Sequence, residues 1–185
     1  MDKMQWTILK PATEVWANEW IKILEIHVRL PTGVETEFYT LDAPDSVAVL
    51  AVDDRRRAVL NRQFRPALGK VIVELPSGQL ENGEDHDRTV HRELAEETGL
   101  YASDIKYLGS FYRNPGRDTG LMHVYFARVA GNTSPHQEQY EYLETIWMPL
   151  DSLITQVLNN EIQDITTVFA VLMLHGQLAQ GNIEL

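Results

Sequence analysis

The segment at residues 78–100, GQLENGEDHDRTVHRELAEETGL, governs how the rest of the chain is interpreted. A helix is expected over residues 85–98, ending at Gly99, because glycine readily takes the left-handed backbone conformation that follows many helix C-termini. Three glutamates of this helix lie at positions i, i+3 and i+4, and residues so spaced share one side of a helix. They are Glu93, Glu96 and Glu97.

These three carboxylates repel one another and, alone, would destabilise the helix that carries them. A bound divalent cation reverses that balance, and a site made only of oxygen ligands suits Mg²⁺ or Mn²⁺. Arg92 lies four residues before Glu96, a spacing that permits an ion pair, and the tight turn at Ser77–Gly78 offers a backbone carbonyl as a further ligand. An ordinary Glu-rich surface helix is the competing interpretation.

The spacing of the whole segment decides between the two interpretations. It matches the pattern G-x5-E-x7-R-E-U-x-E-E-x-G-U, where U is aliphatic, at Gly78, Glu84, Arg92, Glu93, Leu94, Glu96, Glu97, Gly99 and Leu100. At average residue usage, a chance match in a chain of this length is on the order of one in ten million. The pattern is the Nudix box, and the chain therefore resembles the Nudix hydrolase superfamily.

The resemblance implies an α/β (α+β) fold, with a mixed β-sheet sandwiched between helices, and an enzyme that cuts a diphosphate bond with water. It also implies Mg²⁺ as the cofactor, with Mn²⁺ as a substitute. The family's metal ligands carry over to the Ser77 carbonyl, Glu93, Glu96 and Glu97. Glu96 and Glu97 are also expected to be catalytic. The structural residues of the box carry over to Gly78, Glu84, Arg92 and Gly99.

A base that takes a proton from water is expected in the polar loop before the last strand, or within the box itself. The loop region offers Glu138, Glu141 and Glu144. Counted back from residues 147–150, Glu141 matches the position of the base in similar dimeric enzymes. Glu141 is therefore the predicted base, and Glu138 is the alternative.

Two further stretches resemble the ADP-ribose pyrophosphatase branch: residues 62–66, RQFRP, and residues 74–78, ELPSG. The implied reaction is hydrolysis of ADP-ribose, or a close nucleoside diphosphate sugar, to AMP and ribose 5-phosphate. Substrate contacts implied by the resemblance fall on Arg62, Arg65, Gln79 and Asn114. Residues 117–120, RDTG, depart from the branch, so hydrolysis of GDP-mannose or another nucleotide sugar remains an alternative.

The N-terminal region is expected to form a β-hairpin, because residues 20–30 and 34–41 read as strands around the turn at 31–33. In similar dimeric enzymes this hairpin exchanges with a partner subunit, so the resemblance implies a homodimer. Residues 1–42 are interpreted as a dimerisation region and residues 43–185 as the Nudix hydrolase domain. Trp20 and Phe38 match aromatic positions that hold adenine in those dimers; packing in the core is the alternative.

Composition excludes several classes of protein. The net charge of −11 has the wrong sign for non-specific binding to nucleic acid. No apolar run is long enough to span a membrane, and the N-terminus lacks a signal-peptide pattern, so a cytoplasmic protein is expected. A non-catalytic Nudix-fold nucleotide sensor ranks low, because every glutamate of the box is present.

The remaining elements follow from apolar patterning and turn residues. Strands are expected at residues 47–52, 58–64, 71–75, 105–112, 122–129 and 143–148, and helices at 150–159 and 165–178. These elements show no regular βαβ repeat, which favours a mixed sheet covered by helices on two faces over a doubly wound parallel fold.

Overall fold

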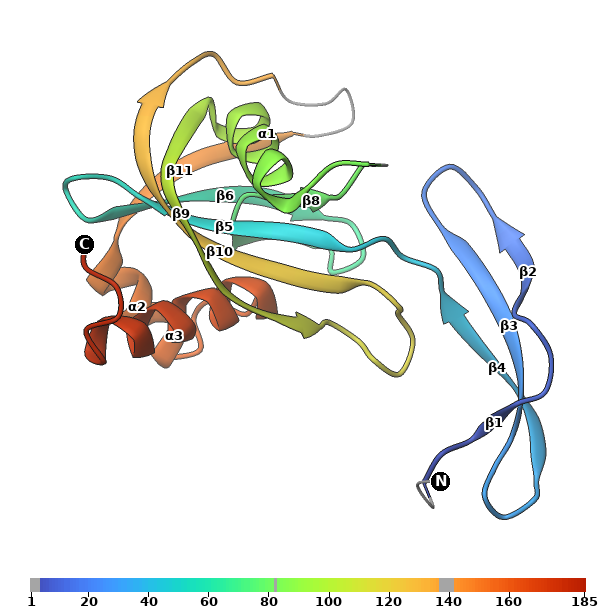
Figure 1. Ribbon diagram of the computed structural model, residues 1–185. Coiled ribbons are helices and arrows are strands. Elements are labelled where there is room, and N and C mark those ends of the chain that lie inside the picture. Colours follow the sequence, from blue (N-terminus) through green and yellow to red (C-terminus); the bar gives the residue numbers. More distant parts are fainter. Residues whose placement is uncertain (1–3, 82, 137–141) are drawn as a thin grey trace. The chain divides into compact units, whose positions relative to one another are not determined.

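The computed structural model describes residues 4–81, 83–136 and 142–185 (Figure 1). The chain forms two compact units. Unit 1 comprises Met1–Pro44 and Tyr112–Leu121, and unit 2 comprises Asp45–Phe111 and Met122–Leu185.

Unit 2 is built on a mixed sheet in which five strands follow the order β11-β6-β5-β10-β9, with β7 beside β6 and β8 beside β5. The strands are β5 (Ser46–Val52), β6 (Arg57–Arg65), β7 (Lys70–Glu74), β8 (Ser77–Gln79), β9 (Leu100–Tyr112), β10 (Leu121–Asn132) and β11 (Leu143–Pro149). β5 and β10 run parallel, whereas β6 pairs antiparallel with β7 and β11. The expected mixed sheet is therefore confirmed.

Helices cover both faces of this sheet, as Figure 1 shows for α1 (His86–Thr98) on one side and α2 (Leu150–Leu158) and α3 (Ile165–Ala179) on the other. Every residue of β5, SVAVLAV, is buried, because its alternate side chains enter the two cores. Val47, Val49 and Ala51 pack with α1 residues, whereas Ala48, Leu50 and Val52 pack with residues of α2 and α3. Among the described helices, none is long and apolar enough to cross a membrane.

Both ends of α1 are fixed by their own residues. At the start, the Asp85 side chain accepts a hydrogen bond of 2.9 Å from the Arg88 N–H, so Asp85 is the N-cap and the helix begins one residue later than expected. At the end, Gly99 has a φ of 70°, in the left-handed region that glycine adopts without strain. A Cβ there would also lie 2.5 Å from the Thr133 carbonyl oxygen. Asp85 and Gly99 thus set where the helix that carries the box glutamates begins and ends.

Unit 1 is a small antiparallel sheet of β1 (Thr7–Ile8), β2 (Thr13–Ala17), β3 (Lys22–Arg29) and β4 (Glu35–Leu41). β3 pairs with all three other strands, and its pairing with β4 is the expected hairpin. The strands β1 and β2, of two and five residues, were not expected.

Residues 112–121 belong to unit 1 through contacts with the end of β4. The Leu41 N–H donates to the Arg117 carbonyl (2.7 Å), and the Thr119 N–H donates to the Leu41 carbonyl (3.2 Å). A parallel bridge joins Leu41 to Asp118. The loop between β9 and β10 therefore pairs with the N-terminal sheet, although its Arg117 lies 77 residues after Thr40 in the chain.

Candidate active site

The box segment begins where β8 lies against α1. Gly78 pairs with Val47 of the buried strand β5, and its Cα faces the carboxyl group of Glu93. A Cβ at position 78 would come within 3.0 Å of the carboxyl carbon and of both oxygens of Glu93. Glycine at this position therefore lets the Glu93 carboxylate lie directly over the β8 backbone, with Glu93 only 8% exposed.

Arg92 connects the helix, the preceding loop and β8. Its Nη1 lies 2.7 Å from Glu93 Oε1 and 3.1 Å from Glu96 Oε2, so the expected pair with Glu96 forms. Its Nη2 lies 3.0 Å from Glu84 Oε2 and donates to the Gln79 carbonyl over the same distance. The hydrogen bond from Arg92 lowers the pKa of Glu84 to about 2, so Glu84 stays ionised at neutral pH.

Glu97 is the most deeply placed box carboxylate, at 5% exposure. Its Oε2 accepts hydrogen bonds from Asn61 Nδ2 of β6 (2.6 Å) and from the Ser77 N–H of β8 (3.3 Å). Its backbone carbonyl accepts a bond of 3.3 Å from Thr145 Oγ1 of β11. Strands β6 and β8 thus fix the carboxylate of Glu97, whereas β11 contacts only its backbone.

These residues fit a hard divalent cation. Glu93 and Glu97 are nine-tenths buried carboxylates on one side of α1, and the donor set around them offers oxygen ligands, which Mg²⁺ and Mn²⁺ prefer. Within the described part of the chain, no three His, Asp or Glu side chains already form a closed metal site. In this structure the charges of Glu93 and Glu96 are paired with Arg92, a cation of the protein itself.

The predicted substrate residues of unit 2 take different positions on β6 and β8. Arg65 contacts Glu74 of β7, with Nη2 2.9 Å from Oε1; burial raises the pKa of Glu74, and Arg65 partly opposes that shift. Gln79 follows Gly78 in β8 and is exposed. Arg62 pairs with Glu144 of β11 at 2.6 Å. Because successive side chains alternate across a strand, Arg62 points to the opposite face from Asn61 and away from Glu97.

The other predicted substrate residues belong to unit 1. Trp20 is 61% exposed and Phe38 is 40% exposed, so packing in a core of this chain does not account for either. The Phe38 ring lies edge-on to Trp6, with centroids 6.2 Å apart. Asn114 is exposed, and its carbonyl accepts hydrogen bonds from the N–H groups of Arg117 and Asp118 (both 2.9 Å).

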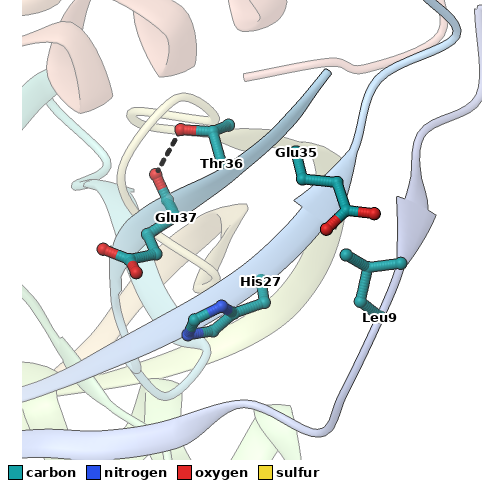
Figure 2. Close-up of a pocket in the computed structure, with 5 residues that line it drawn as sticks. All are labelled: Leu9, His27, Glu35, Thr36 and Glu37. Atoms are coloured by element: carbon teal, nitrogen blue, oxygen red, sulfur yellow. Dashed lines mark hydrogen bonds between the residues drawn. The ribbon is translucent and has the colours of Figure 1, made fainter. Parts of the chain in front are cut away.

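A hollow of about 420 Å³ in unit 1 is a poor candidate for a diphosphate (Figure 2). It is lined by Leu9, His27, Glu35, Thr36 and Glu37, which come from the sheet formed by β3 and β4 and from the segment after β1. The two glutamates add negative charge, which repels phosphate groups. None of its residues belongs to the box.

Two of the predicted bases, Glu138 and Glu141, lie outside the described residues. Conversely, Asn61 and Glu74 contact predicted site residues but were not expected to do so. A signal for Asn61 was present, because it is a single amide that follows the apolar run Ala58–Val59–Leu60 in a strand expected to be buried. No such signal marked Glu74, whose partner Arg65 became apparent only from strand pairing.

Comparison with known proteins gives one family and several relatives. The NUDIX domain family matches residues 42–169 of the chain. The ADP-ribose pyrophosphatase of Bacillus subtilis (strain 168) is 32% identical over 160 residues, covering 85% of this chain and 86% of the relative. The methanol dehydrogenase activator of Bacillus methanolicus is 32% identical over 168 residues, covering 90% of this chain and 91% of the relative.

A solved structure, the crystal structure of an ADP compounds hydrolase, superimposes with a TM-score of 0.82. It covers 97% of this chain and 98% of its own, at 19% sequence identity. At that identity the likeness supports the fold, and the sequence relatives carry the assignment of the family.

Proposed function

The chain belongs to the Nudix family, and from that premise we propose that it hydrolyses the diphosphate bond of ADP-ribose, giving AMP and ribose 5-phosphate. The observation that carries the proposal is the pair of buried carboxylates, Glu93 and Glu97, beside the bare backbone of Gly78. Likeness to the B. subtilis ADP-ribose pyrophosphatase over most of both chains supports the choice of substrate.

The cation would be held by the Ser77 carbonyl, Glu93, Glu96 and Glu97, with Mg²⁺ as the expected ion and Mn²⁺ as a substitute. A cation bound there neutralises charge on phosphate oxygens and makes water more acidic. The protein's own contribution is to fix the ligands. Asn61 and the Ser77 N–H hold Glu97. Arg92 contacts Glu93 and Glu96 and also donates to the Gln79 carbonyl of β8.

The diphosphate would be gripped by Arg65, whose planar guanidinium presents two parallel donors to phosphate oxygens. Contact with the buried Glu74 orients that guanidinium before a substrate arrives. Gln79 and Asn114 are the further contacts proposed for the phosphates and ribose. Arg62 is left out of this set, because its side chain pairs with Glu144 and points away from Glu97, to the opposite face of β6. Glu141 is proposed to accept the proton of the attacking water, with Glu138 as the alternative.

The adenine base would stack between Trp20 and Phe38, a contact worth about 1–3 kcal/mol per base. Both rings are exposed in the single chain, which leaves them accessible for such a role. Unit 1 also exposes a set of large apolar side chains, namely Trp6, Ile8, Val15, Trp16, Trp20 and Ile21. Apolar exposure on this scale is typical of a surface that a partner covers, which supports a homodimer with residues 1–42 as the dimerisation region.

We place the reaction in the cytoplasm, with a nucleoside diphosphate sugar as substrate and with neither nucleic acid nor membrane as partner. Residues 43–185 would form the Nudix hydrolase domain. The net charge of −11 supports the exclusion of nucleic acid as a partner. The phosphate groups of the substrate would be attracted by the bound cation and not by the protein surface.

The test is hydrolysis of a panel of nucleotide sugars with Mg²⁺, with the products identified by mass. ADP-ribose should give AMP and ribose 5-phosphate, and water labelled with ¹⁸O should place the label on AMP if the adenosyl phosphorus is attacked. Glu97→Gln, which keeps the shape and removes a ligand charge, should lower kcat at least about 100-fold. A specificity constant for GDP-mannose more than about tenfold above that for ADP-ribose would reject the proposed substrate.

A further inference from the structure

Asn61 is a buried amide in a strand whose preceding residues are apolar. Ala58, Val59 and Leu60 are fully buried, and Asn61 itself is only 1% exposed. Burying an amide is unfavourable unless its polar atoms are hydrogen-bonded. The position of Asn61 in the site therefore depends on what its two polar atoms contact.

The amide nitrogen of Asn61 faces Glu97. Nδ2 donates to Glu97 Oε2 over 2.6 Å, a short bond of the kind formed with a charged acceptor. An ionised carboxylate can only accept hydrogen bonds, so the nitrogen, and not the oxygen, of the amide must face it. This contact therefore determines the direction of Oδ1 as well.

The amide oxygen lacks a matching contact. Asn61 Oδ1 is buried and accepts no hydrogen bond from any residue that the structure describes. A buried acceptor without a donor is unfavourable, and a water molecule is the smallest group that can satisfy it. Asn61 belongs to the same site as Glu97. A water molecule that enters this site with the cation would therefore find Asn61 Oδ1 as an acceptor.

We propose that Asn61 is a positioning residue of the cation site. Through Nδ2 it holds Glu97 Oε2 in place together with the Ser77 N–H, and through Oδ1 it accepts a hydrogen bond from water in the occupied site. Both donors come from strands, β6 and β8, so the carboxylate is fixed before a cation binds and less side-chain freedom is lost on binding. The inference rests on the proposed function for the presence of a cation and is independent of the substrate.

The experiment measures Mn²⁺ binding by the full-length protein without substrate, from the electron paramagnetic resonance signal of free Mn²⁺. Asn61→Leu keeps the branched shape and removes both polar atoms, and Asn61→Ser is too short to span the 2.6 Å contact. Each should raise the dissociation constant for Mn²⁺ at least about tenfold, the usual effect of losing a partner that orients a metal ligand. At saturating Mn²⁺, kcat should fall at least about tenfold while KM stays within about twofold.

Thr145→Val is the matched control, because it removes a hydrogen bond to the Glu97 backbone and leaves the carboxylate contacts intact. Its dissociation constant should stay within about twofold of wild type. A dissociation constant for Mn²⁺ within about twofold of wild type in both Asn61 variants would overturn the inference. An equal loss of Mn²⁺ affinity in Thr145→Val would overturn it as well. Should Asn61→Leu not fold, Asn61→Ser decides by the same criterion. A wild-type protein that binds no Mn²⁺ would reject the proposed cation site together with this inference.

Discussion

Replacing Gly78 with alanine adds one methyl group where α1 faces β8. That methyl would come within 3.0 Å of the carboxyl carbon and both oxygens of Glu93, so one of the two groups must move. Moving the backbone would disturb the pairing of Gly78 with Val47, which is fully buried. Turning the Glu93 side chain away from a preferred rotamer costs only about 0.5–1.5 kcal/mol, so we expect the side chain to move.

Gly78→Ala should therefore lose activity far more than stability. A loss of about 1 kcal/mol in the free energy of unfolding lowers the Tm of a chain of this size by about 2–4 °C. Displacing a carboxylate proposed to hold the cation should lower kcat at least about 100-fold, equivalent to about 2.7 kcal/mol in the barrier. The affinity for Mn²⁺ should fall in parallel, because the same carboxylate is displaced.

Thermal melting, Mn²⁺ titration and steady-state hydrolysis of ADP-ribose together test this reasoning. Gly176→Ala is the control, because a Cβ there meets nothing within 4 Å and alanine is favoured over glycine inside a helix by about 1 kcal/mol. It should keep kcat and raise the Tm slightly. A Gly78→Ala protein whose kcat stays within about threefold of wild type would refute the assignment of Glu93 to the cation site.

The remaining predictions address acid stability, the base and the N-terminal sheet. The pKa of Glu84 is lowered from its ordinary 4.5 to about 2, so its contribution to stability is complete above pH 4.5 and is lost as the pH falls towards 2. Urea unfolding without metal should accordingly show Glu84→Gln less stable by about 1–3 kcal/mol at pH 7, with the two proteins converging near pH 2. Glu141→Gln should slow turnover at least about 100-fold with little change in Mn²⁺ affinity, and a slow Glu138→Gln instead would move the base to that residue. Trp20→Ala and Phe38→Ala should each raise KM for ADP-ribose about tenfold, and light scattering that shows only monomer at micromolar concentration would contradict the dimer.

Local signals predicted most of the elements in unit 2. The helix at residues 85–98 was recognised because its glycine and its glutamates lie close together in the chain, and the structure ends the helix at Gly99 as expected. Strands β5, β6 and β7 also lie within one or two residues of their expected bounds. Each of these predictions rested on residues that are neighbours in sequence.

The contacts that complete the candidate site join residues far apart in the chain. Asn61 and Glu97 are 36 residues apart, and the bond between them depends on the placement of α1 over β6. The parallel pairing of β5 with β10 likewise has no local signature, because a crossover of many residues separates the strands. Arg92 could be predicted to pair with Glu96 on its own helix, but its contact with the Gln79 carbonyl required the path of β8.

The attachment of residues 112–121 to the N-terminal sheet limits how this protein can be divided. Cutting the chain after Pro44 would remove β4 and strip the Arg117 carbonyl and the Thr119 N–H of their backbone partner, Leu41. Excising unit 1 completely would need a second cut and a new joint between Phe111 and Met122. A single cut in the chain therefore cannot separate unit 1 from unit 2, and a deletion that removes only one of its two segments would leave unit 1 incomplete.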